Sequence, residues 1–373
     1  MHRRLFLQTA AAGATAVSIG RAALSAGKRP KPLRILILGG TRFVGIHLTQ
    51  IAIERGHTVT LFNRGQTNPE LFPNVEKLRG DRDAQLDSLK GRQWDAVIDD
   101  SGYVPRHVRL SAVLLAPNIR RYLYISSISA YASFAAPSDE TSPLVTLADE
   151  SVEKVDNETY GGLKALCERA LRSEVGDGAT IVRPGYIVGP EDTTDRFTYY
   201  PARAARGGEM AAPGAPRDNV QFIDARDLAR FMLQILERNI AGTFNVLAPP
   251  GMFTTGDLIG ASVESANALA KPIPPPKPVW IPARFLEQQQ NLSIYTDFPI
   301  WAPPTGETAG LAQISAARAL KAGLRITPIA TTVSETLAWH LQRPEAERTT
   351  LKAGLQPDQE KALLTAWHAA SHS

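Results

Sequence analysis

The stretch LGGTRFVG at residues 38–45 decides the first step of the fold. It follows the apolar run RILIL and leads into VGIHLTQIAIERG, whose apolar residues recur with helical spacing. A glycine turn between a buried strand and a helix lets the chain bend tightly and places phosphate at the helix N-terminus. Gly39 and Gly45 suit the bend and the close helix packing, although Arg42 stands where the spacing G-x-x-G-x-x-G puts a glycine. The motif predicts a dinucleotide turn but is weak by itself.

The alternation of apolar runs and helical patterns continues beyond that turn. Helical periodicity returns in RHVRLSAVLLA (106–116) and in the segment 157–171. Runs rich in β-branched or aromatic residues and bounded by Gly, Asp or Ser are typical of buried parallel strands. The alternation therefore predicts an α/β fold with a doubly wound parallel sheet of Rossmann type. The expected strands are RILIL (34–38), HTVTLF (57–62), DAVID (95–99), RYLYIS (121–126) and ATIVRP (179–184).

The composition changes after Gly185, where loops and Pro-rich stretches such as KPIPPPKPVWIP replace the alternation. Two interruptions, FIDARDLARFMLQIL and TFNVLA, indicate a helix and a strand that return to the sheet. Ligands bind at the carboxyl ends of the strands in this architecture, so we expect a smaller lobe over that edge. The expected organisation is an export signal at 1–26, a dinucleotide-binding domain at 33–185 with 221–248, a substrate lobe at 186–220 and 249–345, and a C-terminal tail at 346–373.

The end of the second strand bears on which dinucleotide is bound. An NAD site usually has an acid there for the ribose 2′-hydroxyl, whereas this sequence has Asn63 and Arg64. Because a guanidinium pairs well with phosphate, Arg42 and Arg64 favour NADP over NAD. The alternative is that both arginines are solvated surface charges. Asp81, in the turn GDRD, is a candidate for binding the adenine amine and is equally expected as a turn residue.

The candidate chemistry lies in NETYGGLKALCERAL (157–171). Tyr160 and Lys164 are four residues apart at the start of a helix, so their side chains share one face. A nearby ammonium should lower the pKa of the tyrosine, which would then take a proton from a substrate hydroxyl while hydride passes to nicotinamide. The preceding ISSISAY offers donors to the same substrate oxygen, namely Ser126, Ser127 and Ser129.

Five motifs in order carry a family resemblance: LGGTRFVG, SSISAY, YGGLK, RPGYIVGP and FIDARDLA. Together they resemble the extended short-chain dehydrogenases/reductases, the NAD-dependent epimerase/dehydratase family, over residues 33–345. The resemblance implies that Tyr160 is the acid/base, that Lys164 activates it and binds ribose, and that Ser127 orients the substrate. It also implies that the cofactor turn consists of Gly39, Gly40, Thr41, Arg42, Phe43, Val44 and Gly45.

Two positions depart from the family pattern. Arg42 replaces a glycine, and Asn-Glu-Thr replaces the proline-containing approach to Tyr160. The Arg42 variant also resembles the chloroplast stem-loop RNA-binding relatives of the same fold. A non-catalytic RNA-binding protein therefore remains an alternative to an enzyme.

The segment 183–208 is the candidate substrate-binding region. It leaves the predicted sheet at the edge where ligands bind, and aromatic faces with forked donors suit a polyhydroxylated or acidic ligand. An ordinary surface loop with snorkelling arginines is the alternative. The candidate residues are Tyr186, Arg196, Tyr199, Tyr200 and Arg203.

The chain opens with MHRRLFLQTAAAGATAV, which has the parts of a secretory leader. Arg3 and Arg4 precede an apolar stretch at 5–19, and small residues near Ala26 suit cleavage. The order Arg-Arg-Leu-Phe-Leu resembles a twin-arginine signal, which predicts export of the folded protein to the periplasm by the twin-arginine machinery. The apolar stretch is too short for a stable membrane span.

The overall charge and the placement of the histidines and the cysteine exclude several classes of function. Of 41 Lys and Arg against 37 Asp and Glu, three arginines lie in residues 1–26, which contain no acid. The remainder is nearly balanced, so no nucleic-acid partner is expected from charge. The seven histidines are scattered and show no metal-site spacing. Cys167, the single cysteine, excludes an internal disulfide framework and is expected in the core.

Export and a dinucleotide site together predict a redox-neutral reaction. An exported enzyme would find little free NAD(P) to exchange with, so net oxidation would stop after one turnover. We therefore expect epimerisation, dehydration or elimination of a sugar or sugar-like polyol through a transient ketone. The alternatives are an NADPH-dependent reductase and the RNA-binding protein. The expected partners are a small-molecule substrate and the export machinery, and a homodimer is left open.

Overall fold

Seven parallel strands form the central sheet of the computed structural model, which describes residues 31–371. The strand order is β11-β6-β5-β4-β1-β2-β3, so the chain reverses its direction of travel between β1 and β4. This arrangement confirms the predicted doubly wound Rossmann-like sheet. The strands are β1 (Arg34–Leu38), β2 (Thr58–Asn63), β3 (Glu76–Arg79), β4 (Ala96–Asp99), β5 (Arg121–Ile125), β6 (Ala179–Pro184) and β11 (Gly242–Val246).

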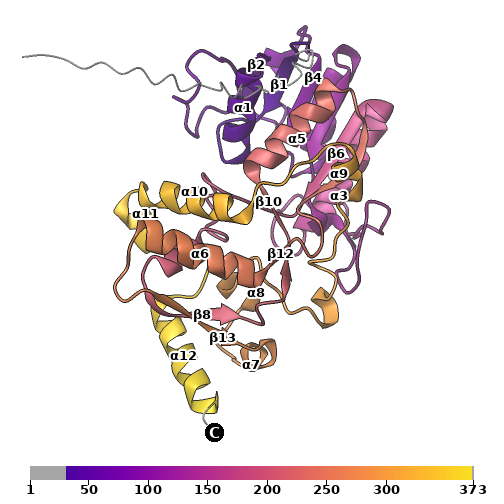
Figure 1. The fold of residues 1–373 in the computed structure, drawn as a ribbon. Helices are drawn as coiled ribbons and strands as arrows, with labels where there is room; N and C mark the ends of the chain where they lie inside the picture. The colour runs from indigo at the N-terminus through magenta and orange to yellow at the C-terminus, as the bar shows by residue number, and fades with distance from the viewer. Residues whose placement is uncertain (1–30, 372–373) are drawn as a thin grey trace, which may run out of the picture. The chain divides into compact units, whose positions relative to one another are not determined.

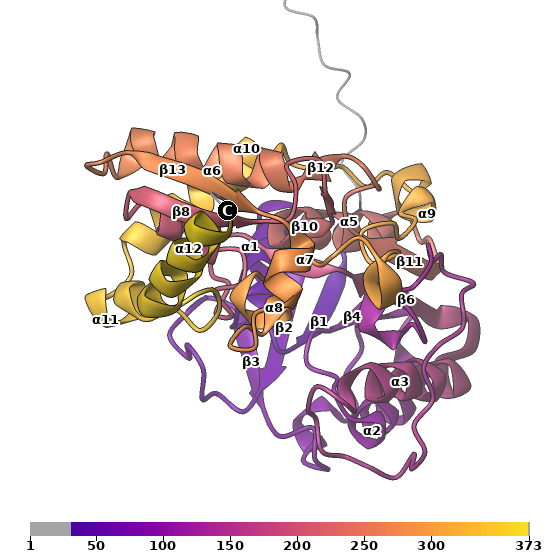
Figure 2. The same cartoon turned by 90° about the horizontal axis from the view of Figure 1, so that it is seen from below.

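Helices cover both faces of this sheet (Figures 1 and 2). Ile35 and Ile37 of β1 pack with α1 (Val44–Glu54) and α5 (Ala225–Glu237). Leu36 and Leu38, which point to the other face, pack with α2 (Pro105–Leu115) and α3 (Tyr160–Val175). Because every second residue faces the same side, a strand buried on both faces has to be apolar throughout. The continuous apolar run RILIL therefore becomes a central strand.

A second group of elements has its own hydrophobic core, which includes the aromatic residues Tyr199, Tyr200 and Trp301. It contains three two-stranded pairs, β7 with β10, β8 with β13 and β9 with β12. The strands are β7 (Tyr186–Val188), β8 (Gly208–Pro213), β9 (Asn219–Val220), β10 (Phe222–Asp224), β12 (Phe253–Thr254) and β13 (Pro276–Ile281). The helices are α4 (Tyr199–Ala204), α6 (Thr255–Leu269), α7 (Ala283–Glu287), α8 (Ile294–Asp297) and α10 (Ile329–Leu341), and α9 (Ala317–Lys321) packs beside β11.

Residues beyond 345, which the sequence suggested are a tail, fold against the second group of elements. They form α11 (Glu345–Thr349) and α12 (Pro357–Ser371), and α12 lies beside β8 (Figure 2). Glu360 of α12 accepts hydrogen bonds from the Arg203 side chain at 2.5 Å and from the Ala211 N–H at 3.0 Å. Residues 32–371 lie in one compact unit. The expected leader at 1–26 lies outside the described residues.

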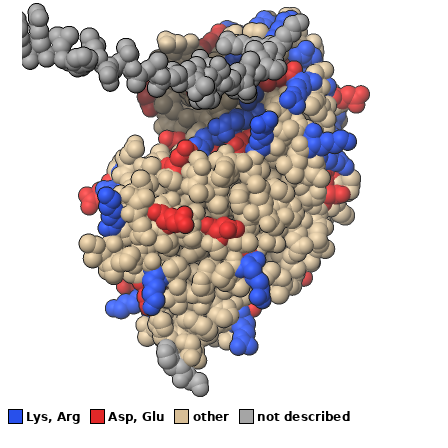
Figure 3. Space-filling view, in the orientation of Figure 1, with Lys and Arg blue, Asp and Glu red and all other residues tan. Residues whose placement is uncertain are grey.

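The surface in Figure 3 carries charges of both signs. Lys and Arg are more frequent over the sheet part, with acidic side chains among them, whereas the part with α6 and α10 shows mostly uncharged residues. Within residues 31–371, none of the helices combines the length and apolar character needed to cross a membrane. The same residues contain no cluster of three His, Cys, Asp or Glu side chains suited to a metal ion.

Candidate active site

A cavity of 1430 Å³ lies where the parallel strands of the sheet end. Its wall includes residues that follow the carboxyl ends of six strands, β1 to β6. Because parallel strands end at one edge of the sheet, residues distant in sequence meet there. The segment after β7, residues of α8 and a short C-terminal segment also contribute to the wall.

The turn after β1 has a backbone that requires glycine. Gly39 has a φ of +123° and Gly40 a φ of +90°, both in the left-handed region. A Cβ on Gly45 would lie 2.5 Å from Asp100 Oδ2 and 2.7 Å from Gly40 Cα, so only glycine allows α1 to begin this close to the turn. Asn63 at the end of β2 donates from Nδ2 to the Gly39 carbonyl oxygen at 2.9 Å and fixes the turn.

This turn fits the phosphate groups of a dinucleotide. Helix α1 has Phe43 at its N-cap, with no side-chain capping bond and no acid in its first turn. The N–H groups of Gly45 and Ile46 donate to the carbonyl oxygens of Arg42 at 2.9 Å and Phe43 at 3.0 Å, and the helix dipole still favours an anion at this end. All residues predicted for the turn line the cavity except Gly45, which lies beneath it.

The two charged residues predicted near the adenosine half also line the cavity. Arg64 NH1 lies 3.9 Å from Asp81 Oδ2, and the Arg64 side chain is 62% exposed. Both residues are thus available at the surface, where a weak pair contributes little to stability.

Asp100 is a cavity residue that sequence reasoning missed. It follows β4 and its carboxylate approaches Gly39 and Gly45. Burial raises the pKa of Asp100 to about 7, and the negative charge of Asp99 acts in the same direction, while a hydrogen bond with the Gly40 backbone opposes it. Ligands bind at the carboxyl ends of the strands in this fold, so Asp100 could have been singled out from its position in the sequence DDSGY.

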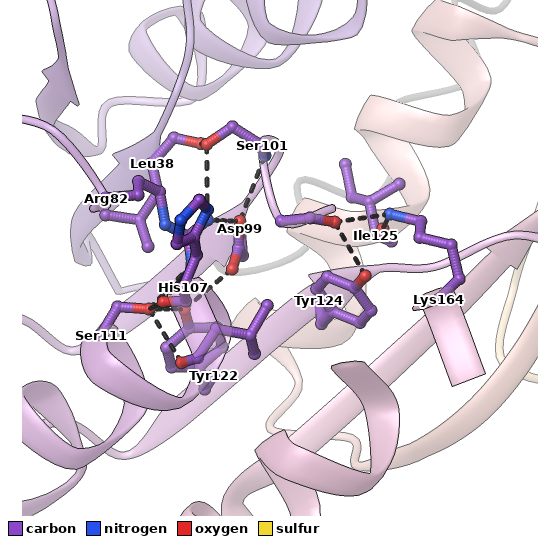
Figure 4. A network of polar contacts seen from close by, with 12 residues as sticks. Leu38, Arg82, Asp99, Ser101, His107, Ser111, Tyr122, Tyr124, Ile125 and Lys164 are labelled. Carbon is purple, nitrogen blue, oxygen red and sulfur yellow. Dashed lines mark hydrogen bonds and ion pairs between the residues drawn. The ribbon is translucent and has the colours of Figure 1, made fainter. Parts of the chain in front are cut away.

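Tyr160 and Lys164 in the first turns of α3 and Ser127 after β5 all line the cavity. The Lys164 ammonium donates to the carbonyl oxygens of Ile125 at 2.7 Å and Gly102 at 2.9 Å (Figure 4). It lies 6.0 Å from the centroid of the Tyr160 ring. The structure therefore brings the three predicted residues together.

The electrostatic environment differs from the one expected for Tyr160. Burial raises the pKa of Tyr160, against the smaller effects of a hydrogen bond with Ser127 and the positive charge of Arg196. The prediction that Lys164 lowers the pKa of Tyr160 is wrong. The Lys164 ammonium instead donates hydrogen bonds to two backbone carbonyl oxygens. Burial also lowers the pKa of Lys164 to about 8. Desolvation disfavours both charged forms here.

Tyr103 is a second aromatic residue that the sequence did not single out. It lines the cavity, its ring centroid is 6.4 Å from that of Tyr160, and the Lys164 ammonium lies 4.9 Å from it. Burial raises its pKa to about 12, so its hydroxyl stays protonated near neutral pH.

Two of the five candidate substrate residues reach the cavity. Tyr186 and Arg196 line it, and the Arg196 guanidinium stacks 5.0 Å from the Tyr186 ring centroid. The prediction of substrate binding is wrong for the other three residues, because α4 directs their side chains into the core of the second group of elements. Tyr199 and Tyr200 are buried among aromatic residues, and Arg203 pairs with Glu360.

A buried polar network supports the floor of the site (Figure 4). Arg82 forms an ion pair with Asp99, and Asp99 also accepts a hydrogen bond from the Tyr122 hydroxyl at 2.9 Å. Ser111 accepts from Arg82 NH2 at 2.8 Å. The network joins the turn after β3 to the end of β4, next to Asp100.

Residues 103–246 match the model of the NAD dependent epimerase/dehydratase family. This region contains Tyr160, Lys164 and Ser127 and covers both β5 and β6.

Two known proteins are similar in sequence. The Chloroplast stem-loop binding protein of 41 kDa b from Arabidopsis thaliana is 28% identical over 257 residues, which span 64% of each chain. Epimerase family protein SDR39U1 from Bos taurus is 27% identical over 274 residues, 66% of this chain and 85% of the relative. The match to the Arabidopsis protein thus spans less than two thirds of that relative.

Solved structures of an NAD+-bound enzyme and of an epimerase family protein share the fold. The enzyme WbmH from Bordetella bronchiseptica, solved in complex with NAD+, has a TM-score of 0.60 at 18% identity, covering 83% of this chain and 98% of WbmH. Human epimerase family protein SDR39U1, solved with NADPH, has a TM-score of 0.53 at 20% identity, covering 82% and 99%. These structures bind NAD or NADPH, and their similarity shows a common fold.

Proposed function

We propose that this protein is an NAD(P)-dependent enzyme of the epimerase/dehydratase type whose reaction returns the hydride that it removes. The observation that carries the proposal is one cavity that contains two kinds of group. A glycine turn and the start of α1 suit phosphate, and Tyr160, Ser127 and Lys164 line the same cavity. The match of residues 103–246 to the family model supports it.

The residues of the cavity have distinct tasks in this proposal. Tyr160 exchanges a proton with the substrate hydroxyl, and Ser127, which hydrogen-bonds to it, orients the same hydroxyl. Lys164 holds the carbonyl ends of β5 and the loop after β4 in place and presents its charge beside the tyrosine rings. A bound nicotinamide dinucleotide would supply the acceptor and donor of hydride.

The choice of cofactor, the substrate class and the location rest on side chains that line the cavity and on the leader-like N-terminal sequence. Arg42 and Arg64 near the cofactor turn favour NADP over NAD. Tyr186 and Arg196 suit a sugar or sugar-like polyol, including an acidic one. The leader-like residues 1–26 favour periplasmic export, where a redox-neutral reaction needs no fresh cofactor.

A panel of free hexoses, hexuronic acids and aldonic acids tests the redox-neutral reaction. We expect at least one isomerised or dehydrated product by NMR, with no change in the amount of reduced cofactor at 340 nm. The hydride returns to the substrate, so an epimerised carbon should carry no deuterium in D2O. Stoichiometric consumption of NADPH would instead make the protein a reductase and contradict this proposal.

RNA binding is the second candidate function, favoured by the similarity to the Arabidopsis stem-loop binding protein. In this case a structured RNA hairpin should bind with an affinity that falls steeply with salt, because phosphate contacts release counterions. The nearly balanced charge of the chain after residue 26 favours the enzyme.

A further inference from the structure

Thr193 joins the dinucleotide turn to a distant C-terminal segment. Arg42 NH2 donates to Thr193 Oγ1 at 2.9 Å, and Lys352 Nζ donates to the Thr193 carbonyl oxygen at 2.9 Å. All three residues line the main cavity. Two positive side chains, one from each end of the folded unit, therefore meet at one point of the cavity wall.

The backbone that carries Lys352 is held by a buried acid. Asp195 accepts from Arg343 NH1 at 2.7 Å through Oδ1 and from the Lys352 N–H at 3.1 Å through Oδ2. Asp195 is 1% exposed, and the Arg343 side chain is 9% exposed. Nearby, Gly354 donates from its N–H to the Thr296 carbonyl oxygen at 2.9 Å. Lys352 thus projects from a fixed support, although its own side chain is accessible.

Arg42 and Lys352 share a second property. Within residues 31–371, neither has a carboxylate oxygen within 4.0 Å, whereas the cavity arginines Arg64 and Arg82 each have one. Arg42 and Lys352 both contact Thr193, so their positive charges repel each other unless an anion lies near both. Phosphate is suited to this place, because its oxygens accept several charge-assisted hydrogen bonds and the N-terminus of α1 is adjacent to Arg42.

We propose that Lys352 binds a phosphate group of the dinucleotide together with Arg42, so that residues 343–356 retain the cofactor in its cavity. This inference rests on the proposed dinucleotide site. It assigns a binding role to a part of the chain outside the region that matches the family model. A cofactor held from both the turn and the C-terminal segment would dissociate slowly, as a protein that cannot exchange it requires.

The phosphate could be the pyrophosphate, common to NAD and NADP, or the 2′-phosphate of NADP alone. Binding of both dinucleotides to the wild-type protein and to Lys352→Met distinguishes them. Loss of affinity for both assigns Lys352 to the pyrophosphate, and loss for NADP alone assigns it to the 2′-phosphate. Both results support a phosphate role for Lys352.

The test measures Kd by calorimetry and the release rate of NADPH and NADH by fluorescence. Because a hydrogen bond between two charged groups is stronger than one between neutral groups, we expect Lys352→Met to raise Kd roughly tenfold or more. Lys352→Arg should retain most of the affinity. Lys361→Met, which removes an exposed lysine of α12 outside the main cavity, should leave Kd unchanged.

Equal Kd and release rates in the wild type and Lys352→Met would overturn the role of Lys352 while leaving the dinucleotide site intact. Failure of the folded wild-type protein, after removal of any copurified nucleotide, to bind either dinucleotide would instead overturn the proposed function itself. Circular dichroism of each variant shows whether the fold is retained, and the exposed position of the Lys352 side chain makes this the expected result.

Discussion

Replacing Tyr160 by phenylalanine should lower the rate about a hundredfold or more while leaving the dinucleotide bound. The substitution removes only the hydroxyl that exchanges a proton with the substrate, and the ring continues to fill its place beside Lys164. Turnover of the substrate found in the panel is the first measurement, and the Kd for NADP is the second.

Tyr103→Phe is the matched control for this substitution. Tyr103 lines the same cavity, lies next to the Tyr160 ring and contacts the same ammonium. Its hydroxyl has no task in the proposed reaction, so its loss should change the rate only slightly. A similar loss of rate in both variants, or unchanged turnover in Tyr160→Phe, would remove Tyr160 from the chemistry.

Replacing Arg82 by methionine should lower the free energy of unfolding by about 3–5 kcal/mol, because it leaves Asp99 as an uncompensated buried charge. The Asp99 side chain is 0% exposed and that of Arg82 is 10% exposed. Urea unfolding followed by circular dichroism measures the change.

Two further variants show whether the lost stability comes from the buried charge. Adding Asp99→Asn to Arg82→Met should restore part of it, since the amide carries no charge. Arg106→Met removes an exposed arginine that pairs with Asp83 and Glu153, and should cost no more than about 1 kcal/mol. Equal losses for Arg82→Met and Arg106→Met would contradict the account of the network.

The sheet was predictable because burial on both faces leaves a direct trace in the sequence. RILIL and ATIVRP are apolar or β-branched almost throughout, and both became buried strands, β1 and β6. The spacing of Tyr160 and Lys164 also placed them correctly, since helical geometry alone puts residues four apart on one face.

Other features of the site depend on tertiary packing and leave no local trace. Aromatic residues such as Tyr199 and Tyr200 suit a sugar-binding loop. Helix α4 begins at Tyr199, however, and directs both side chains into the core of the second group of elements. The pKa of Tyr160 depends on its burial, which spacing does not reveal. Lys352 reaches the cavity only because Asp195, more than 150 residues earlier, holds its backbone.

The nucleotide content of the purified protein tests the central claim most directly. The account predicts that protein purified from the periplasm without added cofactor carries nearly one nicotinamide dinucleotide per chain. Denaturing a known amount and identifying the released nucleotide by mass gives both the occupancy and the choice between NAD and NADP, with NADP expected. A folded, exported protein that releases no dinucleotide would contradict a retained cofactor and a redox-neutral reaction, and would favour the RNA-binding alternative.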